Sequence, residues 1–217
     1  MATPIHPREP GQLDDAENLL EVVAGSDIWV ADHVVIATGI ALLLGAFYGL
    51  TQSISGSGAA WARLGWGVAI IGVGLGLVFM LTEAVAMSAL ADQWAESSGA
   101  KRDRASVAGS AIFQLSLTLS AGATLILFGA TPMLYGAALI RGDDYASWLG
   151  WVGLIAGAVG SVAGVVQFFT GITTLTGLIL VPLGIVVVTL WIIYLGVLMW
   201  RKSAEGAGAD GSESSRR

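Results

Sequence analysis

The sequence contains no cysteine and only two histidines, and this scarcity excludes several kinds of chemistry. Disulfides, thiolate zinc sites, iron–sulfur clusters and cysteine nucleophiles all need the missing thiol. A bis-histidine haem needs two buried histidines, whereas His6 precedes every apolar segment and leaves His33 alone. No HExxH motif is present. We therefore expect neither a metal site nor a cofactor.

Charged residues are scarce as well, at 12% of the 217 residues against about 25% in ordinary soluble domains. They are absent from residues 33–62, 105–140 and 146–200. Apolar residues make up 55% of the chain, and the mean hydropathy is +0.76. Since roughly 20 apolar residues in a helix span a bilayer, the sequence predicts a polytopic protein of the cell membrane, surrounded by lipid.

The apolar runs divide into five predicted spans, and the fold class is therefore an all-α transmembrane helical bundle. The spans are placed at residues 29–51, 63–90, 105–139, 146–170 and 174–200. The third run is longer than a bilayer requires, so its helix should tilt, project beyond the membrane or bend near Pro132. Pro182 is expected to kink the fifth span. A small excess of Lys and Arg predicts a cytoplasmic C-terminus.

Two polar segments flank this bundle, which occupies residues 29–201. Residues 1–28 are predicted to form an extended arm followed by a short acidic amphipathic helix at 13–24, packed on the bundle or on a partner. Residues 202–217 are small, polar and charged, so we expect a disordered tail. The net charge of -6 argues against binding to nucleic acid or to an anionic membrane surface.

Glycines recur at four-residue spacing inside the spans, where they let helix backbones approach closely. Such spacing fits either contacts within one bundle or a seam between copies in a homo-oligomer or larger membrane complex. The candidate packing positions are Gly45, Gly49, Gly72, Gly76, Gly153, Gly157, Gly160 and Gly164.

Four polar residues within the spans are the candidate binding site for a ligand or an ion. An ionisable residue at membrane depth suggests a function, and Glu83 is the clearest case. With five spans, His33, Gln114 and Gln167 fall toward the same membrane face as Glu83. We therefore predict a polar vestibule open to the face that bears the N-terminus. Glu83 could carry a proton or bind a cation or amine, or it could stay neutral and hold helices together.

The spans contain no recognisable catalytic set, and we predict that the protein is not an enzyme. A retinal Schiff base needs a lysine inside a span, whereas Lys101 and Lys202 both lie outside. A serine hydrolase needs serine and histidine together, usually with a strained GxSxG turn, and that motif is absent.

The C-terminal half carries a sequence pattern that is similar to one in other membrane proteins. A span ending in YGAALIR (135–141), a short acidic turn and then WLGWVGLIAGAVGSVAG (148–164) resembles a broad family of uncharacterised prokaryotic membrane proteins, over about residues 60–201. Those proteins typically have six spans, and here the acidic helix at 13–24 stands in place of the first. The resemblance implies the helical fold and a cytoplasmic C-terminus, but no activity.

Two functional hypotheses follow from these observations. The first is a non-enzymatic membrane protein that serves as an accessory subunit of a membrane complex or binds a lipid or another small ligand. The alternative is a proton- or cation-coupled transporter or channel that uses Glu83.

Overall fold

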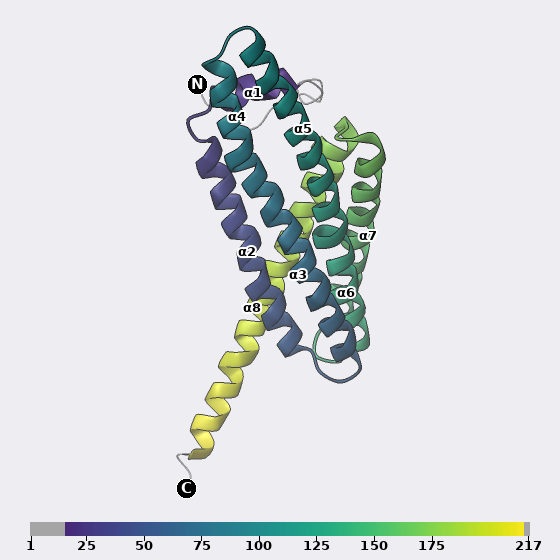
Figure 1. The fold of residues 1–217 in the computed structure, drawn as a ribbon. Helices are drawn as coiled ribbons and strands as arrows, with labels where there is room; N and C mark the ends of the chain where they lie inside the picture. The colour runs from purple at the N-terminus through teal and green to yellow at the C-terminus, as the bar shows by residue number, and fades with distance from the viewer. Residues whose placement is uncertain (1–15, 215–217) are drawn as a thin grey trace.

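The five-span helical bundle predicted from the sequence is confirmed by the structure, a computed structural model (Figure 1). The structure describes residues 16–214, except the side chains of residues 16, 174 and 205–214. Within those residues every regular element is helical. Five helices are long and apolar enough to cross a membrane: Trp29–Ser53, Gly56–Ala95, Ala100–Arg141, Ser147–Thr170 and Leu175–Ala204.

Several spans are built from more than one helical segment. In chain order the elements are α1 (Ala16–Ala24), α2 (Trp29–Ser53), the 3-10 turn η2 (Gly56–Gly58), α3 (Ala59–Leu81), η3 (Thr82–Met87), α4 (Ser88–Ala95), α5 (Ala100–Ala123), η4 (Thr124–Ala130), α6 (Thr131–Arg141), α7 (Ser147–Thr170), η5 (Thr174–Leu180) and α8 (Val181–Ser214). The segments η3, η4 and η5 are π-helical. Such segments are rare and often mark functional sites.

The long third span and the end of the second span extend together past the other spans at the N-terminal end of the bundle (Figure 1). Figure 1 shows α4 and the start of α5 extending past the turn between α7 and η5, with α1 lying across them. Leu20 of α1 packs against Gly109 of α5, and Ser106 Oγ donates a hydrogen bond of 2.9 Å to Glu17. The acidic helix therefore packs on the outside of the bundle.

Both span prolines directly follow a π-helical segment. Pro132 has no N–H to donate and stands just after η4. Thr131 Oγ1 donates a hydrogen bond of 2.8 Å to the carbonyl oxygen of Ile126, so a side chain supplies a donor next to the proline that lacks one. Pro182 follows η5 in the same way. A wider helical turn thus precedes each of the positions where the sequence predicted a bend or kink.

Buried side chains form two clusters at different depths of the bundle. The larger lies among α2, α3, α6, α7 and α8 and includes Phe47, Tyr135 and Trp191. The second, here called the apolar cap, lies at the end of the bundle nearest the N-terminus. It consists of Leu19, Leu20, Val23, Trp29, Met87, Ala91, Trp94, Ala105 and Phe113.

The glycines of α7 make close contacts inside the bundle. A Cβ placed at Gly157 would lie 2.5 Å from the carbonyl oxygen of Gly129, and one at Gly164 would lie 2.6 Å from the amide nitrogen of Leu125. Gly160 faces the backbone of Phe128 in the same way, Gly153 faces the Trp191 ring and the carbonyl oxygen of Pro132, and Gly72 of α3 faces Leu127. These positions therefore bring α7 and α3 against η4 and α6 within one chain.

The predicted flanking segments have different outcomes. Helix α8 continues to Ser214, where the sequence predicted disorder from residue 202 onward. The segment contains no proline, so nothing in it ends the helix sterically. Figure 1 shows this part of α8 leaving the bundle. The predicted extended arm at residues 1–12 lies outside the described residues.

Candidate ligand site in the bundle

Glu83 lies in the π-helical segment η3, and its side chain is only 8% exposed. The π-helical turn changes the hydrogen bonding of the backbone, and the indole Nε1 of Trp29 donates 2.9 Å to the Glu83 carbonyl oxygen. Helix α2 is thereby tied to η3 next to the carboxyl group. The wider turn and this tether together fix the place of Glu83 inside the membrane.

His33 is the most buried polar residue beside Glu83, at 1% exposure. Its Nδ1 lies 2.8 Å from the carbonyl oxygen of Trp29, and its ring lies 4.4 Å from the Trp29 ring between centroids. Because a carbonyl oxygen only accepts, Nδ1 carries the proton. In the neutral ring Nε2 is then the acceptor nitrogen.

Ser116 of α5 completes the group, and sequence reasoning missed it. The Glu83 carboxyl interacts with the Ser116 hydroxyl and with the His33 imidazole. The Ser116 side chain is 2% exposed, and its hydroxyl does not meet the geometry of a formed hydrogen bond with any described residue. We call His33, Glu83 and Ser116 the polar layer. No sequence signal separates Ser116 from the other span serines.

Only one of the two glutamines predicted for the same site is buried in the bundle. Gln114 of α5 is exposed on the outside of the bundle, so it points away from the polar layer. Gln167 of α7 is buried, and its Nε2 donates a hydrogen bond of 3.3 Å to Ser120 Oγ. The Oε1 of Gln167 has no hydrogen-bond partner among the described residues. The structure thus brings His33 and Glu83 together and turns Gln114 away from them, while Gln167 contacts Ser120, one helical turn from Ser116.

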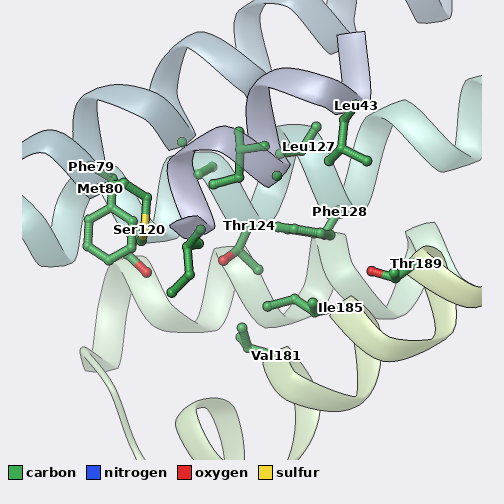
Figure 2. A pocket seen from close by; sticks show the side chains of 15 residues that line it. Leu43, Phe79, Met80, Ser120, Thr124, Leu127, Phe128, Val181, Ile185 and Thr189 are labelled. Carbon is green, nitrogen blue, oxygen red and sulfur yellow. The ribbon is translucent and has the colours of Figure 1, made fainter. Parts of the chain in front are cut away.

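A cavity of about 330 Å³ lies among α2, α3, α5, η4 and α8 (Figure 2). Its wall is mostly apolar and includes Leu43, Phe79 and Phe128. Figure 2 shows Val181, Ile185 and Thr189 of α8 on one side of this space, with η4 opposite. Three hydroxyl groups interrupt the apolar wall, those of Ser120, Thr124 and Thr189.

The polar layer lies one helical turn from this cavity along three separate helices. Three residues of the cavity wall stand three or four positions from the polar layer in the sequence. Ile36 follows His33, Met80 precedes Glu83, and Ser120 follows Ser116. One turn is about 5.4 Å along a helix. The polar layer therefore stands beyond one end of this apolar space, one turn further along the three helices.

The other side of the polar layer is closed. One turn further along the same helices stand Trp29, Met87 and Phe113, all buried members of the apolar cap. Helix α1 covers them with Leu19, Leu20 and Val23. The prediction of a vestibule open to the N-terminal face is therefore wrong, because the count of spans fixes which residues share a depth but not what covers them.

Among the residues whose side chains the structure describes, no group of three or more His, Asp or Glu could hold a metal ion. Comparison with protein-family models, with curated proteins and with solved structures finds no match to this chain. The assignment of function therefore depends on the cavity and the polar layer.

Proposed function

We propose that this protein is a non-enzymatic membrane bundle that binds a lipid-like molecule, with its apolar chain in the cavity and its polar head at the polar layer. The observation that carries the proposal is the position of an apolar cavity one helical turn from three buried polar groups. Ligand sites typically combine an apolar wall with a few convergent polar groups that fix orientation.

The cavity wall favours a ligand that arrives from the bilayer. Its edge residues Ile36 and Ile185 are 38% and 37% exposed, so the space reaches the lipid-facing surface of the bundle. The apolar cap closes the route from water at the N-terminal end. A molecule already dissolved in the membrane has the shorter path to the polar layer.

The chemistry of the polar layer favours a head that donates hydrogen bonds. The Glu83 carboxyl accepts them, and burying any polar group without a partner is costly. A primary amine offers several donors and, when protonated, a charge opposite to an ionised carboxyl. A long-chain amine is therefore the ligand class that fits both parts of the site.

The test uses dodecylamine, dodecanol and dodecane as probes of the purified protein. Gly39 lines the cavity, and a Cβ added there would have nothing within 4 Å, so Gly39→Leu should fill the space without disturbing its surroundings. Gly45 on the same helix is equally open but does not line the cavity, so Gly45→Leu is the matched control. We expect dodecylamine to raise the melting temperature of the wild type and of Gly45→Leu, but not of Gly39→Leu.

A second variant tests the head of the ligand. Glu83→Gln keeps the size of the side chain but removes its ability to become negative. We expect it to abolish the preference for dodecylamine over dodecanol while leaving some binding of both. Equal stabilisation of Gly39→Leu and wild type by dodecylamine would refute the cavity as the binding site.

An accessory role in a membrane complex is compatible with this ligand site. Gly45 lies on the exposed side of α2, and a Cβ added there would have nothing from another helix within 4 Å. Native mass spectrometry of protein released gently from its own membranes would test this role. Co-released foreign subunits would support it, and release of the bare chain with a bound lipid would favour ligand binding alone.

The second candidate function is proton- or cation-coupled transport through Glu83. The specific observation is a buried histidine, His33, beside the buried Glu83 carboxyl group. Proton flux into liposomes carrying the protein would be lost in Glu83→Gln under this function. Gly39→Leu separates the two candidates, since it should block ligand binding and leave proton exchange at Glu83 intact.

A further inference from the structure

We propose that a second site, at the opposite end of the bundle, binds the headgroup of an anionic phospholipid. The site is a hollow of about 390 Å³ where α7 begins and α8 leaves the membrane. Its wall includes Tyr145, Trp148, Tyr194, Leu198, Arg201 and Lys202. It is separate from the cavity proposed above and does not depend on that proposal.

The hollow lies at the expected boundary between lipid and water. The charge-free run of residues 146–200 ends directly before Arg201 and Lys202. Trp148 and Tyr194 are 55% and 46% exposed, and their ring centroids lie 6.0 Å apart. Exposed Trp and Tyr side chains concentrate at the level of lipid headgroups, so the aromatic wall places this hollow at that level.

Two cations form the polar part of the wall. Lys202 donates a hydrogen bond to the carbonyl oxygen of Asp144, and its Nζ lies 4.0 Å from the centre of the Tyr145 ring. These contacts hold the ammonium group at the hollow and still leave it N–H donors. Arg201 makes no hydrogen bond or ion pair with any residue whose side chain is described. Its planar guanidinium suits the oxygens of a phosphate.

An acidic residue in the same wall has its charge engaged elsewhere. The Asp144 carboxylate accepts a 2.7 Å hydrogen bond from the Ser55 amide and a 3.0 Å bond from the Ser55 hydroxyl. The net charge of -6 argues against an anionic partner for the chain as a whole. At this hollow, however, two cations, Arg201 and Lys202, stand beside a single carboxylate that is already bound to Ser55, so the local charge favours an anion.

The apolar part of the wall favours a phospholipid over free phosphate. Leu198 and the exposed rings of Trp148 and Tyr194 continue from the cations toward the membrane, where acyl chains can lie against them. Basic pockets between membrane helices bind anionic headgroups, which are abundant in the cytoplasmic leaflet. The C-terminus predicted on that side from the sequence agrees with this source of ligand.

The experiment measures retained lipid by native mass spectrometry, after incubation of the protein with equal amounts of phosphatidylglycerol and phosphatidylcholine. The test variant is the double substitution Arg201→Gln with Lys202→Gln. The control removes two cations from the other end of the bundle, as Lys101→Gln with Arg102→Gln. We expect the wild type and the control to prefer phosphatidylglycerol, and the test variant to lose about tenfold or more of that preference.

Several outcomes overturn the proposal. An unchanged preference in the test variant, or an equal loss in the control, would show that this hollow does not select the lipid. Displacement of phosphatidylglycerol by inorganic phosphate at similar concentration would show a phosphate site instead. Circular dichroism melting confirms that each variant is folded, and an unaltered preference in Gly39→Leu separates this result from any failure of the cavity proposal.

Discussion

Helices α7 and α2 both carry glycines at regular spacing, but they use them in opposite ways. On α7, a Cβ at Gly157 or Gly164 would collide with the backbone of η4, so these glycines bring two helices into contact. On α2, Gly39 and Gly45 have no neighbour within 4 Å of such an atom. At these positions α7 packs backbone to backbone, and we call α3, η4, α6 and α7 the packed half of the bundle. Helix α2 has no such contact at Gly39 and Gly45, and we call α2 and α8 the open half.

The open half is where the cavity lies. Helices α2 and α8 supply part of its wall, and α3, α5 and the tightly packed η4 supply the rest. Glycine in a membrane helix stabilises the bundle only where another helix approaches it, because lipid tails solvate an exposed glycine as well as any small apolar residue. The contrast indicates that α3, η4, α6 and α7 form the rigid frame against which a ligand would bind.

The largest expected effect comes from substituting a glycine in the packed half. In Gly157→Ala the added Cβ would lie 2.5 Å from Gly129 O and 2.7 Å from Met133 N, both backbone atoms that move only with their helix. We expect a loss of about 3 kcal/mol in the free energy of unfolding, at the upper end for overpacking. Circular dichroism during denaturation in detergent measures it.

The matched control is the same substitution in the open half. Gly45→Ala meets nothing within 4 Å, and alanine favours helix over glycine. We expect unchanged or slightly raised stability. A similar loss in both variants would contradict the division into packed and open halves.

The next effect concerns the attachment of α8 to the packed half. Trp191 is 4% exposed, and its Nε1 donates 2.9 Å to the carbonyl oxygen of Leu149 on α7. Trp191→Phe keeps an aromatic ring but removes this donor, and we expect a loss of about 1–2 kcal/mol. The same denaturation measures it, with Trp200→Phe on the exposed side of α8 as the control, for which we expect no change.

A smaller effect is expected where α2 meets α6. Tyr135 is fully buried, and its hydroxyl donates 2.9 Å to Phe47 O and lies 2.6 Å from Thr51 Oγ1. Tyr135→Phe removes both bonds and retains the stacked ring, whose centroid lies 5.1 Å from that of Phe47. The expected loss is about 1 kcal/mol. An unchanged unfolding free energy would show that α2 is held here by ring packing alone.

The spans could be predicted because charge and hydropathy report directly on the bilayer. The absence of charge from residues 146–200, for example, leaves little freedom in placing the last two helices. The π-helical segments could not be predicted, because the residue types of Thr82–Met87 also occur in ordinary α-helices. Their geometry depends on tertiary hydrogen bonds such as that from Trp29 to Glu83 O.

The candidate site was only partly predictable for a related reason. Glu83 and His33 stand out because ionisable residues are costly at membrane depth. Gln114 shares that depth but faces outward, whereas Ser116, two positions further along α5, faces Glu83. The rotation of a helix about its axis is set by its neighbours. Span three has almost no charge to mark its outer face, so its sequence does not fix that rotation.

The smallest expected effect concerns a polar tie between α2 and the packed half. The Asp144 carboxylate, between α6 and α7, accepts hydrogen bonds from Ser55 just after α2. These bonds, of which the one from the Ser55 amide has the largest effect, hold the pKa of Asp144 below its ordinary value of 3.8.

A lowered pKa means that these hydrogen bonds from Ser55 to Asp144 stabilise the fold at neutral pH and are lost as the pH falls through the folded-state pKa. Because Asp144 is largely solvated, the loss should stay below about 1 kcal/mol. Unfolding free energies should therefore decline slightly more below pH 3.8 in the wild type than in Asp144→Asn. Identical pH profiles would show that packing alone joins the two halves at this end.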